Sequence, residues 1–272
     1  MPSDSDVSRR PGRRAAVRVG RVLVAAAVAA TTFPAVASAE IIELGQTTTQ
    51  AVPSCPAKPC LAVSRTTGYQ AKIGPTRGIF TATQGGRIVA WSITLGAPTD
   101  KQIKFFNTTL GGAPSAGITV FKPAEHLFGT ITAQSPVVDL TPYLGETVQF
   151  PLERSVPIKK NQTVALTVPT WAPALAIGFG TDTSWRASRA RDQCDDTASQ
   201  TAINTLGTVT RFMCLYKTAR LTYSVTIVTN PHGPKKKKTP ATDTAKQRKA
   251  SAAAVAAGPR RAAMRFGGAL GG

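Results

Sequence analysis

The stretch that decides the fold is Val89-Ala90-Trp91-Ser92-Ile93-Thr94-Leu95, in which large apolar residues alternate with small or polar ones. A two-residue period places the apolar side chains on one face of a β-strand and the polar ones on the other. Gly85-Gly86 precedes this stretch as a turn signal. Near the end of the region that is expected to fold, Leu221–Ile227 shows the same alternation. Both stretches therefore predict strands with one buried face.

Outward from these two stretches, residues 78–230 consist of short β-type runs separated by Gly, Pro, Asn and Asp, with no sustained helical period. The other runs are Ile118–Phe121, Leu127–Thr132, Val137–Leu140, Val148–Leu152, Thr163–Val168, Ala174–Phe179 and Thr208–Tyr216. About nine short strands at such spacing predict an all-β domain. The favoured form is an antiparallel β-sandwich of jelly-roll-like topology. Val148–Leu152 and Thr163–Val168, on either side of a polar turn, are expected to form an antiparallel pair.

Residues 40–77 are polar and Pro-rich near the start and are interpreted as an irregular lead-in that contains Cys55 and Cys60. With Cys194 and Cys214, the chain has four cysteines, which allow three disulfide pairings. The favoured pairs are Cys55–Cys60 and Cys194–Cys214. A four-thiolate zinc site is the alternative, but the C-x2-C spacing typical of such sites is missing. No metal and no cofactor are therefore predicted.

Residues 1–39 have the organisation of a secretory signal peptide. Six arginines precede the apolar run Val22–Ala30, and Ala37-Ser38-Ala39 matches an A-x-A cleavage site. An uncleaved membrane anchor is the alternative, at the short limit of length for a span. We expect cleavage, a secreted or envelope-associated protein, no transmembrane span afterwards, and disulfide formation in an oxidising compartment.

The formal net charge of +19 is concentrated at the two ends of the chain. Residues 1–39 carry +4, residues 40–230 carry +6 and residues 231–272 carry +9. The last segment is predicted to be a disordered basic tail because its like charges repel and large apolar residues are few. Its candidate contacts to polyanions are Lys235, Lys236, Lys237 and Lys238. Anionic envelope polymers are the expected partners rather than a specific nucleic acid, and a non-specific soluble tail is the alternative.

Catalytic signatures are weak in the part of the chain expected to fold. His126 is the single histidine there, and no G-x-S-x-G motif accompanies it. The carboxylates show no spacing that pairs two of them across a sugar. Asp192, Asp195 and Asp196 form an acidic cluster, interpreted as an ion-paired loop with a calcium site as the alternative.

Sugars stack on exposed flat rings, which makes aromatic residues in loops candidates for glycan contact. Trp171 and Trp185 lie in loop-like sequence contexts, whereas Trp91 fits a core strand. Trp171 and Trp185 are therefore the candidate ligand-binding residues. The alternative is that they close the sandwich core as lids.

Several of these features together resemble uncharacterised secreted proteins of GC-rich actinobacteria. They are the Arg- and Ala-rich leader, Cys55 and Cys60 near the mature start, residues 167–176 (TVPTWAPALA), and residues 185–189 (WRASR) before Cys194. The resemblance spans roughly residues 1–230 and implies export and a β-sandwich. It implies no activity and no catalytic residue.

The sequence thus predicts an exported, non-enzymatic β-sandwich protein that is envelope-associated or binds a ligand such as a glycan. The alternative is a secreted hydrolase acting on glycans. Two facing carboxylates, or His126 beside a serine and an acid in a cleft, would favour the hydrolase.

Overall fold

A computed structural model describes residues 38–48, 50–196 and 199–231. These residues all belong to the second of the two units into which the chain divides, Val36–Gly272. The predicted signal peptide up to residue 37 and the basic tail from residue 232, with Lys235, Lys236, Lys237 and Lys238, lie outside the described residues.

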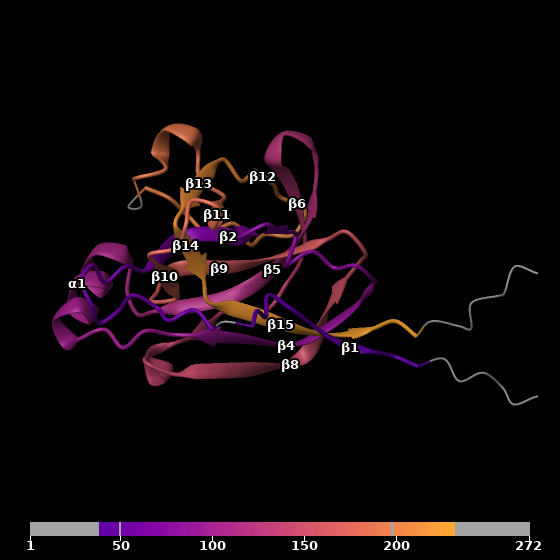
Figure 1. Cartoon of the computed structure of the whole chain (residues 1–272), viewed down its shortest axis with the longest axis horizontal. Helices are drawn as coiled ribbons and strands as arrows, with labels where there is room; N and C mark the ends of the chain where they lie inside the picture. The colour runs from indigo at the N-terminus through magenta and orange to yellow at the C-terminus, as the bar shows by residue number, and fades with distance from the viewer. Residues whose placement is uncertain (1–37, 49, 197–198, 232–272) are drawn as a thin grey trace, which may run out of the picture. The chain divides into compact units, whose positions relative to one another are not determined.

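One layer of the domain is a four-stranded antiparallel sheet with the order β1-β15-β4-β8. Its strands are β1 (Ile41–Leu44), β4 (Gly86–Thr94), β8 (Thr147–Ile158) and β15 (Tyr223–Thr229). The two alternating stretches of the sequence are neighbours here, with Trp91 opposite Val225. Figure 1 shows β1 and β15 side by side at one end of this layer.

The second layer is a larger, curled antiparallel sheet with the order β12-β6-β5-β9-β2-β11-β13 (Figure 1). These strands are β2 (Val63–Ile73), β5 (Ser115–Pro123), β6 (Phe128–Gln134), β9 (Thr163–Ala172), β11 (Ser184–Ala187), β12 (Val209–Arg211) and β13 (Cys214–Lys217). Smaller elements are β3 (Thr76–Arg77), β7 (Val138–Asp139), the pair β10 (Leu175–Ile177) and β14 (Ala219–Leu221), the helix α1 (Asp100–Leu110), and the 3-10 turns η1 (Glu125–Leu127), η2 (Thr141–Tyr143) and η3 (Arg191–Gln193).

The main core fills the space between the two sheets. Trp91, Ile93 and Val225 point into it from the four-stranded sheet, and Ile118 and Leu166 from the curled one. Each of these side chains is at most 1% exposed. Complete burial of such a side chain stabilises the fold by roughly 1.5–3 kcal/mol. The predicted antiparallel β-sandwich is confirmed, and the chain passes repeatedly between the two sheets, as a jelly-roll-like topology requires.

A second apolar cluster lies on the other face of the curled sheet. It contains Phe121, Ile131, Ala165 and Phe212, with Ile203 packed against them. Ile203 belongs to the long connection between β11 and β12, which therefore covers part of this face. The curled sheet is thus buried on both faces where this connection lies over it.

The prediction of an irregular lead-in over residues 40–77 is wrong in part, because β1 and the eleven-residue β2 lie within it. The sequence pattern did not identify β2 as a strand. β2 is central in its sheet and its polar side chains are buried, so apolar and polar residues do not alternate along it. The Gln70 amide donates to the carbonyl oxygens of Ser184 (3.1 Å) and Ala219 (3.3 Å). Its side-chain oxygen accepts from the Leu221 N–H at 2.9 Å. A buried strand can carry such residues when they are hydrogen-bonded.

The helix α1 was not expected. Its few buried side chains, Phe106 and Leu110, give too short a pattern to show a helical period. Local signals nevertheless define its ends. Thr99 and Gln102 form a capping box, and Gly111 ends the helix in the left-handed conformation at φ 95°.

Two strand predictions also change in detail. The predicted pair around residues 159–162 does not form, because β8 pairs with β4 in one layer and β9 pairs with β2 and β5 in the other. The turn instead carries the chain between layers. The run Thr208–Tyr216 is two strands, β12 and β13, which lie at opposite edges of the curled sheet.

Candidate ligand-binding site

Trp171 lies inside the domain, within strand β9 rather than in a loop, and is 0% exposed. Its indole N–H donates to Asn107 Oδ1 at 3.0 Å and to the Gly112 carbonyl oxygen at 2.9 Å. The ring packs against Phe106, with the centroids 4.8 Å apart. Trp171 therefore fastens α1 and its C-terminal turn to the sheet, and it presents no face on which a sugar could stack.

Trp185 lies in strand β11 and is 4% exposed, so its predicted loop position is also wrong. Its ring stacks on that of Tyr216 with 4.4 Å between centroids. Both candidate tryptophans thus pack inside the domain, as the alternative interpretation expected.

All four cysteines are paired as favoured, Cys55 with Cys60 and Cys194 with Cys214. The zinc alternative is therefore wrong, since the structure leaves no free thiolate. The second disulfide joins the β11–β12 connection to β13. The favoured pairing of Cys194 with Cys214 is thus confirmed.

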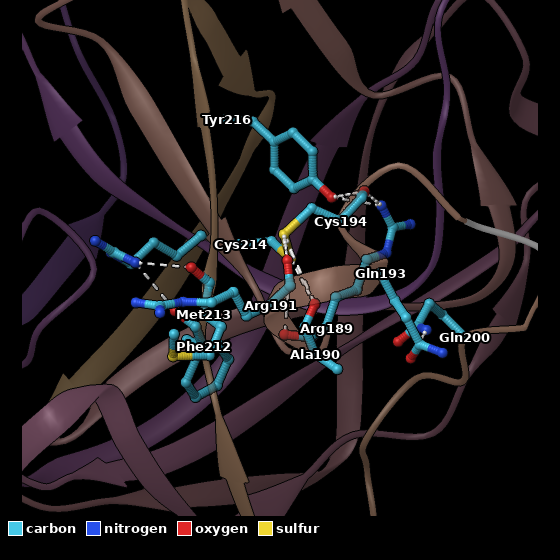
Figure 2. Close-up of a disulfide and its surroundings, with 11 residues drawn as sticks. Arg189, Ala190, Arg191, Gln193, Cys194, Gln200, Phe212, Met213, Cys214 and Tyr216 are labelled. Atoms are coloured by element: carbon cyan, nitrogen blue, oxygen red, sulfur yellow. Dashed lines mark hydrogen bonds between the residues drawn. A yellow bond between two sulfur atoms is a disulfide. The ribbon is translucent and has the colours of Figure 1, made fainter.

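Figure 2 shows the surroundings of the Cys194–Cys214 disulfide, where the side chains of Arg189 and Tyr216 converge on Cys194. Arg189 is 4% exposed and donates to the Tyr216 hydroxyl at 2.8 Å and to the carbonyl oxygens of Cys194 and Ser64. Its partners are a hydroxyl and backbone carbonyls rather than the nearby aspartates. This arginine fixes the connection against β2 and β13, and its role is structural.

One member of the acidic cluster, Asp196, is hydrogen-bonded to Ser199. Asp196 accepts from the Ser199 N–H (3.3 Å) and hydroxyl (2.7 Å). Within the described ranges, no three His, Cys, Asp or Glu residues gather in a way that could hold a metal ion. His126 is exposed in η1, and its backbone oxygen accepts from Arg211 Nε at 2.8 Å.

The structure instead contains a polar hollow that sequence reasoning missed. Its volume is about 430 Å³. It lies between residues 45–48, 50 and 51, which we call the strap, and the ends of β4, β8, β14 and β15. Nine lining residues are Ser, Thr or Gln, namely Gln46, Thr47, Thr48, Gln50, Ser92, Thr94, Thr147, Thr222 and Ser224. The volume falls within the roughly 300–1,000 Å³ typical of small-molecule sites.

The same alternation that builds the core also builds the floor of the hollow. Trp91 and Ile93 point into the sandwich, so Ser92 and Thr94 point outward from β4. The Thr94 and Thr147 hydroxyls lie 2.9 Å apart in a cross-strand hydrogen bond. The Gln50 amide reaches down from the strap to both hydroxyls, at 3.5 and 3.4 Å.

Arg220 is the one charged residue among the described lining residues. It is 9% exposed, and burial lowers the pKa of its guanidinium below the usual value. One of its terminal N–H groups donates to the Gly45 carbonyl oxygen at 3.4 Å. Gly45 has φ +87°, and a Cβ there would meet the Phe80 ring at 2.2 Å. Glycine is therefore required where the strap begins, and this fixes the carbonyl that holds Arg220.

A second hollow of about 360 Å³ adjoins the first and shares Gln50, Ala51 and Thr94 with it. Its other lining residues are mainly apolar, and they include Pro53, Leu95 and Ala97. The strap thus separates a polar compartment from a more apolar one. The sequence offered one signal, the polar run Gln46–Gln50, but nothing in it showed that this run crosses a sheet.

The fold and the hollow together define a disulfide-linked β-sandwich with a ligand-sized polar site. Comparison with known proteins found no matching family model, no matching curated protein and no matching solved structure. Among the residues that the structure describes, no helix is both long and apolar enough to cross a membrane.

Proposed function

We propose that this protein is an exported, non-enzymatic binding module that holds a glycan in the polar hollow. The observation that carries the proposal is the lining of nine Ser, Thr and Gln side chains. Hydroxyl and amide groups both donate and accept hydrogen bonds, as sugar hydroxyls do. A sugar could therefore replace water in the hollow with little loss of hydrogen bonding.

The proposed mode of binding differs from stacking on tryptophan. Gln50 from the strap and Thr94 with Thr147 from the sheet lie within hydrogen-bond distance of one another, so they would contact the same part of the ligand. The described lining residues carry no carboxylate and no imidazole for general acid–base catalysis, and the Tyr223 hydroxyl donates to the Val164 carbonyl oxygen at 2.9 Å. The hollow therefore favours binding over hydrolysis.

Export and association with the envelope are part of the same proposal. They are supported by the Arg-rich leader with its A-x-A site and by the two disulfides. The Glu40 carbonyl oxygen accepts from the Thr229 N–H at 2.8 Å, so both described ends leave from one pole of the domain. β15 runs from Tyr223 at the hollow to Thr229 at this pole, a distance of about 20 Å. Attachment at this pole would leave the hollow accessible.

The experiment for the hollow is a glycan and wall-polymer array probed with the mature protein. A Thr94→Val/Thr147→Val variant keeps shape and strand propensity but removes two hydroxyls, and we expect its binding to fall about tenfold or more. Thr226→Val is the matched control, because Thr226 lies on β15 outside the hollow. If the wild-type protein bound nothing on the array, or if both variants lost the same amount of binding, the proposal would be overturned.

The basic tail is proposed to add salt-sensitive attachment to anionic envelope polymers through Lys235, Lys236, Lys237 and Lys238. A chain ending at residue 230 retains every described strand. We expect this truncated protein to be released from isolated envelopes at lower salt than the full chain. Identical release profiles would remove the tail from the proposal.

A further inference from the structure

The polar hollow is continuous with the second, more apolar hollow beside it. The two hollows share Gln50, Ala51 and Thr94, so a ligand that fills the first reaches the second directly. Their volumes are similar, at about 430 and 360 Å³. The second hollow is therefore large enough to determine what kind of ligand the whole site takes.

The second hollow offers a ligand few hydrogen bonds. The N–H groups of Leu95, Gly96 and Gly145 are already hydrogen-bonded to backbone carbonyl oxygens. Seven of its ten lining residues have no polar side-chain atom, namely Ala51, Val52, Pro53, Leu95, Gly96, Ala97 and Gly145. Such a surface gains free energy mainly when apolar atoms cover it and water leaves.

Val52 leaves apolar surface open to water in this hollow. Its side chain is 80% exposed, whereas Pro53 and Leu95 are buried in the domain. An apolar group placed in the hollow would cover Val52 and lose its own contact with water at the same time. Each methylene group of a ligand that is fully buried in this way raises the affinity about fourfold.

Gln50 lies where the two hollows meet. Its amide donates to the Thr94 and Thr147 hydroxyls at 3.5 and 3.4 Å, longer than the roughly 2.7–3.2 Å usual for such bonds. These long bonds are weak, so the amide can exchange one of them for a bond to a ligand oxygen. An ether or ester oxygen that joins a sugar to an apolar chain is an acceptor of this kind.

We propose that the two hollows bind one amphipathic ligand, a sugar in the polar hollow that carries a short alkyl or acyl chain in the second hollow. The proposal rests on the proposed function, because it names the class of glycan that the same site takes. Small-molecule sites combine apolar surface with a few polar groups, and the two hollows do so only together. Hydrogen bonds to a sugar largely replace bonds to water, so the chain supplies most of the affinity. At about 30 Å³ for each water-sized group, the second hollow has room for roughly a dozen non-hydrogen atoms.

The test uses glycosides that share a sugar and differ only in the length of the chain. Methyl, butyl and hexyl glycosides of glucose, galactose, mannose and N-acetylglucosamine are titrated into the unmodified protein by calorimetry, below the concentrations at which they form micelles. Within the sugar series that binds most tightly, we expect the hexyl glycoside to bind at least about tenfold more tightly than the methyl glycoside, a gain that half-burial of each added methylene already provides. Hexanol, which has the chain without the sugar, should bind at least about tenfold more weakly than the hexyl glycoside. This comparison does not depend on whether a variant folds.

A substitution at Val52 then assigns the chain to the second hollow. Val52 lines this hollow but not the polar one, and its exposure means that Val52→Asp replaces no core residue. A carboxylate beside the chain should remove the gain from chain length, because it must lose water when the chain covers it. The affinity for the methyl glycoside should stay within about twofold. Val209→Asp is the matched control, since Val209 is an exposed valine on β12 outside both hollows, and it should keep the full dependence on chain length.

The outcomes separate the two proposals. Equal affinities for the methyl and hexyl glycosides, or no binding of any alkyl glycoside by a protein that binds glycans on the array, would overturn the amphipathic ligand and leave glycan binding intact. Hexanol that binds as tightly as the hexyl glycoside, or a Val52→Asp variant that keeps the dependence on chain length, would overturn the joint use of the two hollows. Absence of binding to every glycan, on the array and in solution, would overturn the proposed function itself.

Discussion

The two disulfides enclose loops of very different length, and this predicts unequal contributions to stability. Cys55–Cys60 spans a sequence separation of 5, and Cys194–Cys214 spans 20. A cross-link reduces the conformational entropy of the unfolded chain by a constant plus an amount that increases with the logarithm of loop length. At 25 °C this amounts to about 2 kcal/mol for the short loop and about 3.3 kcal/mol for the long one. Replacing both cysteines of a pair by alanine should therefore cost about 1.3 kcal/mol more at the long loop.

The two double variants are well matched as a comparison. Each pair has one buried cysteine, Cys55 at 5% and Cys214 at 1% exposure, and one half-buried partner. Losses of packing are therefore similar and largely cancel in the difference. The free energy of unfolding is measured by guanidinium titration of the unmodified protein and both variants. An equal or smaller loss for the Cys194→Ala/Cys214→Ala variant would refute the loop-length argument.

Three further predictions concern single side chains. Thr99→Ala removes the N-cap of α1 and should cost about 1 kcal/mol of unfolding free energy in a denaturant titration, whereas Thr99→Ser should cost less. Trp171→Phe loses two hydrogen bonds and leaves a void beside Phe106, so the same titration should show a loss of about 2 kcal/mol or more. Burial raises the pKa of Tyr223 well above its usual value. The contribution of this shift to the free energy of unfolding is therefore complete below pH 10, where the phenol is neutral in the unfolded chain as well, and it declines as the pH rises further. Tyr223→Phe should show a shallower loss of stability above pH 10, and an unchanged alkaline slope would contradict this cause.

The fold class could be predicted from the sequence because the two strands that decide it have one solvent-facing and one buried face. Trp91 and Val225 show this, since alternation identified both strands and the structure pairs them. β2 was missed because Gln70 and its neighbours are polar yet buried, and only their tertiary partners make that burial favourable. α1 was missed because two buried side chains are too few to reveal a period, although Thr99 and Gln102 marked its start.

The candidate site was harder to predict than the fold, for a physical reason. Trp171 and Trp185 stood next to proline or serine and polar residues, which favoured loops, but each is buried by elements distant in sequence. The hollow joins the strap to Thr147 and Arg220, which are about 100 and 170 residues away. Nothing local to any of these segments indicates that they meet. Disulfide pairing was easier to predict, because four cysteines allow only three pairings.

The pairing of β1 with β15 has a consequence for how this domain can be combined with others. The Glu40 N–H donates to Thr229 Oγ1 at 2.9 Å, so the two described ends are as close as neighbouring strands, roughly 5 Å. A surface loop of another protein has ends separated by a similar distance. Residues 40–230 could therefore be inserted into such a loop with short linkers, and neither the host nor the sandwich would have to open to accept the connection.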